Sequence, residues 1–132
     1  MRNTSLDEEM QLQGQINKFA KICGVGDLMV ERGKLKITVL KKTDTKQIFG
    51  DNPPIRQSIE ACTVFREGQV FIVGEDGDMP EGFCHWAWHD LYKKVITLMY
   101  GGNFPWMEEE GTSVSCCTDG LRPVIFELRR ME

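Results

Sequence analysis

The chain has 132 residues, of which 41% are hydrophobic and 27% charged, and its formal net charge is −4. This size and composition are typical of one folded domain and exclude a wholly disordered chain. The negative balance argues against nucleic-acid binding, which depends on cations that neutralise phosphates. No apolar run approaches the ~20 residues of a membrane-spanning helix, and residues 1–5 lack a signal-peptide core. We therefore expect a cytoplasmic protein with neither a nucleic-acid nor a membrane partner.

The first part of the chain predicts a helix over about residues 6–23. Ser5 and Glu8 have the spacing of a capping box, in which each side chain bonds the other residue's amide. A stripe of small and apolar residues follows at helical spacing, and Gly24 is a natural stop. The stripe comprises Leu12, Ile16, Phe19, Ala20 and Cys23. We interpret residues 1–33 as a helical extension whose stripe packs on the rest of the chain or joins it to a second copy, as a homo-oligomer.

Residues 34–132 predict the main domain. Leu35, Ile37 and Val39 alternate with the residues between them, as in a half-buried strand. Residues 62–65 and 69–73 flank a glycine-bearing turn, which predicts a strand, a turn and a second strand. A helix is predicted over about residues 85–100, with Gly101 and Gly102 at its end. One face of it carries Cys84, Trp88, Leu91, Val95 and Leu98.

The last predicted element is a hairpin of residues 112–118 and 121–129. Asp119-Gly120 is the sequence of a two-residue type I′ turn, and this turn places Cys117 opposite Arg122. Because neighbouring residues of a strand face opposite ways, Cys116 and Cys117 lie on opposite faces. Pro123 has no amide to donate, so we expect this strand at an edge or bulged there. The fold class is therefore α+β, with a mainly antiparallel sheet of four or five strands, one covering helix and the N-terminal helix.

Two thiols and an aromatic segment predict a ligand pocket. Cys84 stands at the start of a helix, whose amides favour a thiolate, and Cys117 is expected beside the Arg122 cation. Residues 83–106 hold seven of the twelve aromatic residues, a concentration that can wall an apolar pocket. Among them Trp86 and Trp106 have no evident packing role. The predicted small-molecule site therefore consists of Cys84, Trp86, Trp106, Cys117 and Arg122.

The cysteines also suggest a metal site. An odd number of cysteines without an export signal favours free thiols over a disulfide framework. Zinc or an iron–sulfur cluster can be held by thiolates, and the candidate ligands are Cys62, Cys84, Cys116 and Cys117. Since Cys116 and Cys117 diverge on a regular strand, three thiols completed by Asp119 or water are easier to build. His85 and His89 are four residues apart on the predicted helix, so both could bind one metal ion. The same spacing also occurs on an ordinary exposed helix face, so it does not by itself indicate a metal site.

Several strings of the sequence belong together. They are Glu81-Gly82-Phe83-Cys84, Gly101-Gly102-Asn103-Phe104-Pro105-Trp106 and Cys116-Cys117-Thr118-Asp119-Gly120-Leu121-Arg122-Pro123-Val124. In combination they resemble an uncharacterised family of small bacterial and archaeal proteins, over about residues 35–130. The resemblance implies that Cys62, Cys84, Cys116 and Cys117 belong to the family pattern and that Cys23 does not. In the family pattern, a proline usually stands where this chain has His85 and an acid where it has His89. This difference counts against a His85–His89 metal pair as a property of the family.

Three functions remain open from the sequence. The first is a binding module with a cysteine-lined site for a ligand or metal beside the aromatic segment. The second is a structural or interaction protein whose cysteines only fill the core. The third is an enzyme with Cys84 or Cys117 as thiolate nucleophile, for which no histidine is evidently placed as a base.

Overall fold

The chain divides into two units, residues 1–31 and 32–132, in a computed structural model that describes residues 6–22, 32–57 and 59–132. The first unit contains α1 (Leu6–Ile22), with Asp7, Glu8 and Glu9 in its first turn, where carboxylates stabilise the helix amides. The predicted helix is thus confirmed, although Ser5 and Cys23 lie outside the described residues. None of the described helices has the length and apolarity to cross a membrane. Cytoplasmic localisation and self-association through α1 stay predictions.

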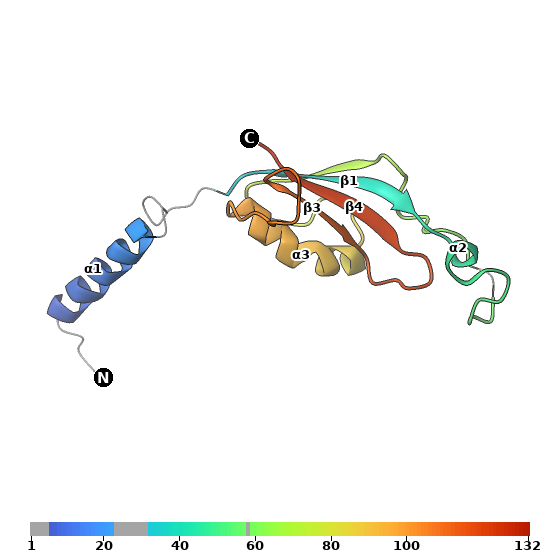
Figure 1. Ribbon diagram of the computed structural model, residues 1–132, viewed down its shortest axis with the longest axis horizontal. Coiled ribbons are helices and arrows are strands. Elements are labelled where there is room, and N and C mark those ends of the chain that lie inside the picture. Colours follow the sequence, from blue (N-terminus) through green and yellow to red (C-terminus); the bar gives the residue numbers. More distant parts are fainter. Residues whose placement is uncertain (1–5, 23–31, 58) are drawn as a thin grey trace. The chain divides into compact units, whose positions relative to one another are not determined.

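The second unit is built on one antiparallel sheet with the strand order β2-β1-β4-β3 (Figure 1). The strands are β1 (Leu35–Lys42), β2 (Val70–Val73), β3 (Thr112–Cys116) and β4 (Val124–Arg130). A short helix, α2 (Thr45–Phe49), follows β1 and starts from a capping box between Asp44 and Gln47. With a four-stranded antiparallel sheet and helices, the structure confirms the predicted α+β class.

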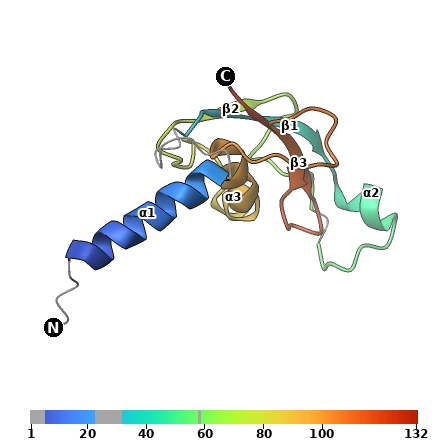
Figure 2. The ribbon, with the colours of Figure 1, turned by 60° about the vertical axis from the view of Figure 1, so that its left-hand side comes forward.

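One face of the sheet is covered by α3 (His85–Met99), as Figures 1 and 2 show. The helix buries Leu91, Val95 and Leu98 against the sheet, while Trp88 is only partly buried beside them. The sheet contributes every second residue, a pattern that the alternation in β1 predicted. These sheet residues are Leu35, Ile37, Val39, Phe71, Val73, Val124, Phe126 and Leu128. The predicted covering helix and its apolar face are therefore confirmed.

The predicted strand at residues 62–65 is wrong, because this segment is a loop. The place beside β1 is already taken at this point: Gly68 N–H donates to Val39 O at 2.7 Å, and Val39 N–H donates to Gln69 O at 2.9 Å. What anchors the loop is Phe65, which is buried and meets three other phenylalanine rings at centroid distances of 5.0 to 5.8 Å. The segment 62–65 is therefore held by the packing of one side chain and not by the hydrogen bonds of a strand.

The hairpin is present, but its loop is longer than the predicted two residues, because β3 ends at Cys116 and β4 begins at Val124. Cys117 lies opposite Val124, with its N–H donating to Val124 O at 3.1 Å, so the predicted pairing of Cys117 with Arg122 is wrong. A type I′ turn needs positive φ at both central residues, whereas all described positive-φ residues are glycines and Gly120 is not among them. Asp119 instead uses its carboxylate to accept from the Leu121 amide at 3.1 Å, a local bond that competes with a tight turn.

Pro123 lies just outside β4, and the predicted edge position of this strand is wrong. β4 is an inner strand, between β1 and β3. Pro123 contributes its carbonyl, which accepts from Thr43 N–H at 3.0 Å and from Thr43 Oγ1 at 2.7 Å. The pairing of β1 with β4 does contain a register shift between Val39 and Lys41, but it lies opposite Ile125 and Phe126 and not at Pro123.

Arg130 ties the end of α3 to the sheet. Its Nη1 donates to the carbonyls of Leu98 and Gly102, both at 2.9 Å, and Nη2 donates to Asn103 Oδ1 at 2.8 Å. A cation is favourable there because helix carbonyls make the C-terminus negative. Gly111 lies against this side chain with φ +75, and a Cβ on it would come within 3.2 Å of Arg130 Nη2. The hydrogen bonds of Arg130 with the end of α3 therefore require glycine at position 111.

We expect Phe65→Ala to destabilise the domain by about 3–5 kcal/mol, since it removes a fully buried ring from an aromatic cluster. Urea denaturation followed by tryptophan fluorescence measures the change. The matched control is the preceding residue, Val64, which is 51% exposed. Val64→Ala should cost less than about 0.5 kcal/mol. Equal effects of the two substitutions would contradict the anchoring role of Phe65.

Candidate functional site

The two tryptophans of the predicted pocket lie at opposite ends of α3. Trp86 is in the first turn, 65% exposed, and Trp106 follows the C-terminus, 71% exposed and packed on Phe104 at 5.2 Å between ring centroids. A helix of 15 residues is about 22 Å long. One small molecule therefore cannot contact both rings, and the aromatic segment does not form one pocket wall.

The thiols differ in exposure. Cys117 is buried, with its Sγ accepting from Val124 N–H at 3.3 Å, while Cys62 and Cys84 are half-buried against the same core. Cys84 is the N-cap of α3, but its side chain makes no capping hydrogen bond. Cys116 is exposed, so the two neighbouring cysteines lie on opposite faces, as the strand alternation predicted.

The predicted metal ligands do not form a cluster in this structure. Among the described residues, which include Cys62, Cys84, Cys116 and Cys117, no group of three or more histidine, cysteine, aspartate or glutamate side chains is arranged to hold a metal ion. The opposite orientations of Cys116 and Cys117 account for part of this. A zinc or iron–sulfur centre therefore gains no support from the geometry.

Arg122 bonds to Asp119 and Glu60, whereas the sequence predicted it beside Cys117. Its Nε forms a salt bridge with Asp119 Oδ2 at 3.3 Å, and its Nη1 lies 3.5 Å from Glu60 O. In the strand pairing, Cys117 is opposite Val124 and not Arg122. Arg122 thus stabilises the loop through Asp119, and its expected effect on the Cys117 thiol stays a prediction.

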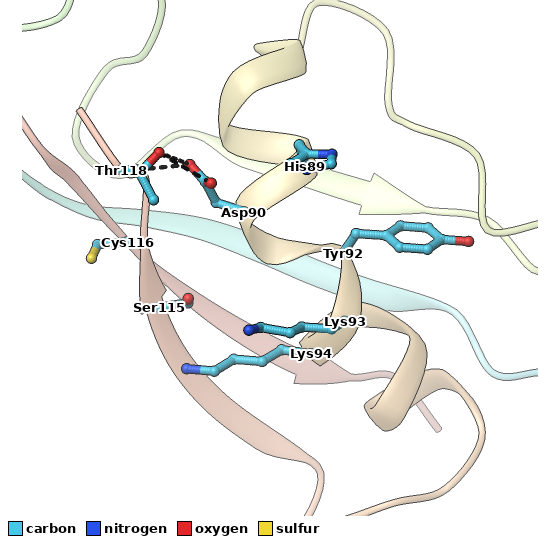
Figure 3. Close-up of a pocket in the computed structure, with 8 residues that line it drawn as sticks. All are labelled: His89, Asp90, Tyr92, Lys93, Lys94, Ser115, Cys116 and Thr118. Carbon is cyan, nitrogen blue, oxygen red and sulfur yellow. Dashed lines mark hydrogen bonds between the residues drawn. The ribbon is translucent and has the colours of Figure 1, made fainter.

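The structure instead shows a groove of about 600 Å³ between α3 and β3 (Figure 3). From α3 it is lined by His89, Asp90, Tyr92, Lys93 and Lys94, and from β3 and the loop after it by Ser115, Cys116 and Thr118. Lys93 and Lys94 extend from the helix toward the strand, whereas Tyr92 and the Cys116 sulfur point away from the groove. Cys116 therefore meets the groove with its main chain.

One end of the groove is closed by a hydrogen-bonded set. Asp90 Oδ2 accepts from the Thr118 amide at 2.7 Å, and the Thr118 hydroxyl donates to the same carboxylate at 3.0 Å. The Trp86 indole N–H donates to Thr118 Oγ1 at 2.6 Å. This set fixes the first turns of α3 to the segment that follows β3.

The middle of the groove is positively charged. Lys94 Nζ donates to the Val114 carbonyl at 2.8 Å, and within the described part of the chain neither Lys93 nor Lys94 forms a salt bridge. Arg129 lies elsewhere, on β4, where side-chain hydrogen bonds with Glu109 and then with Glu127 raise the pKa of its guanidinium. The Arg129 charge is therefore paired with two carboxylates, whereas the two lysines share the groove with one carboxylate, Asp90, and form no salt bridge among the described residues.

Sequence reasoning missed Lys93, Lys94 and Ser115. The two lysines looked like the solvated flank of an amphipathic helix, and Ser115 like one position of a strand. The only signal was that Lys94 lies next to the buried Val95, close to the edge of the covered face. Finding the groove required knowing that β3, and not another strand, lies beside α3.

Comparisons with known proteins do not identify the chain. No family model, no curated protein and no solved structure matches it. The resemblance of Cys116-Cys117-Thr118-Asp119-Gly120 and its companions to a family of small proteins stays a prediction. Function must therefore be argued from the geometry of residues 32–132.

Thiol labelling tests the placement of the cysteines. Among the four cysteines that the structure describes, we expect iodoacetamide to modify Cys116 fastest and Cys117 slowest, at least about a hundredfold slower, because a buried thiol reacts only through opening of the structure. Residue-resolved mass spectrometry measures the rates. Cys116→Ser should remove the fast label and Cys84→Ser should not. Rapid native labelling of Cys117 would contradict its buried position.

Proposed function

We propose that residues 32–132 form a binding module that holds an anionic ligand in the groove between α3 and β3. The observation that carries the proposal is the pair Lys93 and Lys94, which extend into a groove of about 600 Å³ without a salt bridge among the described residues. Volumes of this order are typical of small-molecule sites. The proposal keeps the ligand-binding class expected from the sequence and moves the site from the cysteines to the lysines.

The charge pattern favours an anion over other ligands. The groove has one carboxylate, Asp90, which is bonded to Thr118 at one end of the groove and keeps its negative charge. Two ammonium groups stand against this one carboxylate, so the charged side chains that line the groove have a net positive charge of one. Charge-assisted hydrogen bonds to a carboxylate or phosphate are stronger than neutral ones, which makes such a group the natural partner.

Ser115 supplies a neutral donor in the same groove. It faces α3, on the side of the sheet that carries the buried Ser113 and Cys117. Its hydroxyl has no hydrogen-bond partner among the described residues, in contrast to the hydroxyl of Thr118. An anion held by the lysines can accept from Ser115 as well, so the groove offers donors from both walls.

The groove is held by regular elements and not by loops alone. α3 is fixed at one end by the Asp90–Thr118 bonds and at the other by Arg130, and β3 is paired with β4 along its length. Rigid supports keep binding groups in place without a large ordering cost on binding. This favours a binding role over one as a purely structural domain.

The test is a titration of uniformly ¹⁵N-labelled protein with citrate and with pyrophosphate. We expect chemical-shift changes at the amides of Lys93, Lys94 and Cys116, and an affinity that falls with salt. The double change Lys93→Met and Lys94→Met should weaken binding by about tenfold or more, because charge-assisted hydrogen bonds are lost while the aliphatic stems remain.

The matched control is Lys34→Met, which removes an exposed lysine that does not line the groove. It should leave the affinity unchanged. Binding that is equally strong in the double variant and in the control, or no binding of any anion, including the peptides described below, would overturn the proposal.

A further inference from the structure

β3 lies at the edge of the sheet, so half of its main-chain groups have no neighbouring strand. In an antiparallel pair, hydrogen-bonded and non-hydrogen-bonded residue pairs alternate. Arg130 N–H bonds to Gly111 O and Cys117 N–H bonds to Val124 O, which sets this alternation for the whole of β3. The amides and carbonyls of Thr112, Val114 and Cys116 therefore point outward, away from β4.

Two of the outward-pointing main-chain groups on this edge already form hydrogen bonds with side chains of α3. Lys94 Nζ donates to Val114 O at 2.8 Å, and Asp90 accepts from the Thr118 amide at 2.7 Å. Between these two points, the amide and carbonyl of Cys116 have no hydrogen-bond partner among the described residues. The groove therefore contains one open main-chain position, with its lysines on one side.

We propose that the anionic ligand is an extended acidic peptide segment of a partner protein, which adds to the edge of β3 inside the groove. This inference rests on the proposed function and names its ligand class. Peptides bind in this way to several unrelated domains: main-chain hydrogen bonds supply affinity and side chains at alternate positions supply specificity. Here one peptide residue exchanges both of its main-chain bonds with Cys116.

The register follows from the pleat of the sheet. The peptide residue opposite Cys116 has its side chain on the open face, together with that of Cys116. Its two neighbours have theirs on the α3 side, where Lys93, Lys94 and Ser115 are. The recognised pattern is therefore acid-x-acid, with x opposite Cys116. Lys94 can leave the Val114 carbonyl to meet a carboxylate, since a peptide amide can replace it there.

A second copy of β3 fits this edge poorly. The strand sequence Thr112-Ser113-Val114-Ser115-Cys116 has no carboxylate to offer the lysines. Antiparallel pairing of two such strands about a two-fold axis would also bring two Lys93–Lys94 pairs toward each other, and like charges repel. The charge of the groove therefore favours an acidic segment from another protein.

The experiment uses the full chain and four blocked hexapeptides. In one, glutamate alternates with valine; in another, glutamate alternates with threonine. The third has the glutamate–valine composition with the three glutamates first, and the fourth is the first peptide with its valine amides methylated. We expect the alternating peptides to bind at least about tenfold more tightly than the other two, because only they combine the charge pattern with free amides. Hydrogen exchange of the Cys116 amide should slow on binding.

A pair of variants tests the same bond from the protein side. Cys116→Pro removes the outward amide without removing a bond to β4, a change that edge strands tolerate, and it should weaken the alternating peptides by about tenfold. Cys116→Ala keeps the amide and should bind as the native chain does. If the proline variant does not fold, the methylated peptide still tests the bond.

The outcomes separate the two proposals. Lysine-dependent binding of citrate, without binding of either alternating peptide, overturns the peptide inference and leaves the proposed function standing. Equal binding of the methylated peptide, or unchanged exchange at Cys116, also overturns the inference. So does a dimer in sedimentation whose Cys116 amide is protected without peptide, since the edge would then pair copies of the chain. Failure of citrate, pyrophosphate and the peptides overturns both.

Discussion

The packing of Phe65 and Phe83 into the sheet is the constraint from which the rest of the domain follows. Both residues belong to irregular segments, and their rings meet each other at 5.0 Å and Phe126 of β4 at 5.1 and 5.6 Å. Burial of two large rings outweighs the missing strand bonds of these segments. Because Phe83 is fixed two residues before α3 begins, it sets where the helix starts and which strands the helix covers.

The position of α3 then determines the chemistry of the domain. The helix lies nearest the edge strand β3, so polar side chains on its flank reach main-chain groups that a central strand would have used in pairing. An uncovered edge is a site of unwanted association, and proteins often protect it with charged side chains. Lys94 occupies the Val114 carbonyl and Asp90 the Thr118 amide, and between them the main chain of Cys116 has no hydrogen-bond partner among the described residues. The side chains that bond this part of the edge thus border the position where we propose that a peptide adds.

The sequence predicted what depends on periodicity and missed what depends on neighbours. The alternation of Leu35, Ile37 and Val39 and the helical spacing of Leu91, Val95 and Leu98 are local properties, and both elements are present in the structure. Residues 62–65 have strand composition, but no local pattern shows that Gly68 and Gln69 already occupy the place beside β1. Asp119-Gly120 suggested a tight turn, while the Asp119 carboxylate bonds the Leu121 amide instead. The groove was not predictable, because Lys94 and Val114 are twenty positions apart and meet only after folding.

Gly111 affects the groove indirectly, through its contact with Arg130. It is not among the groove residues, yet a methyl group there would come within 3.2 Å of Arg130 Nη2 and 3.3 Å of its Cζ. The guanidinium would have to move, and it holds the carbonyls of Leu98 and Gly102. A single alanine would therefore press on the contacts that hold the end of α3, and the positive φ of residue 111 would strain its backbone as well, while every side chain that lines the groove keeps its identity. For protein engineering, position 111 is therefore one to keep as glycine when the lysines of the groove are varied.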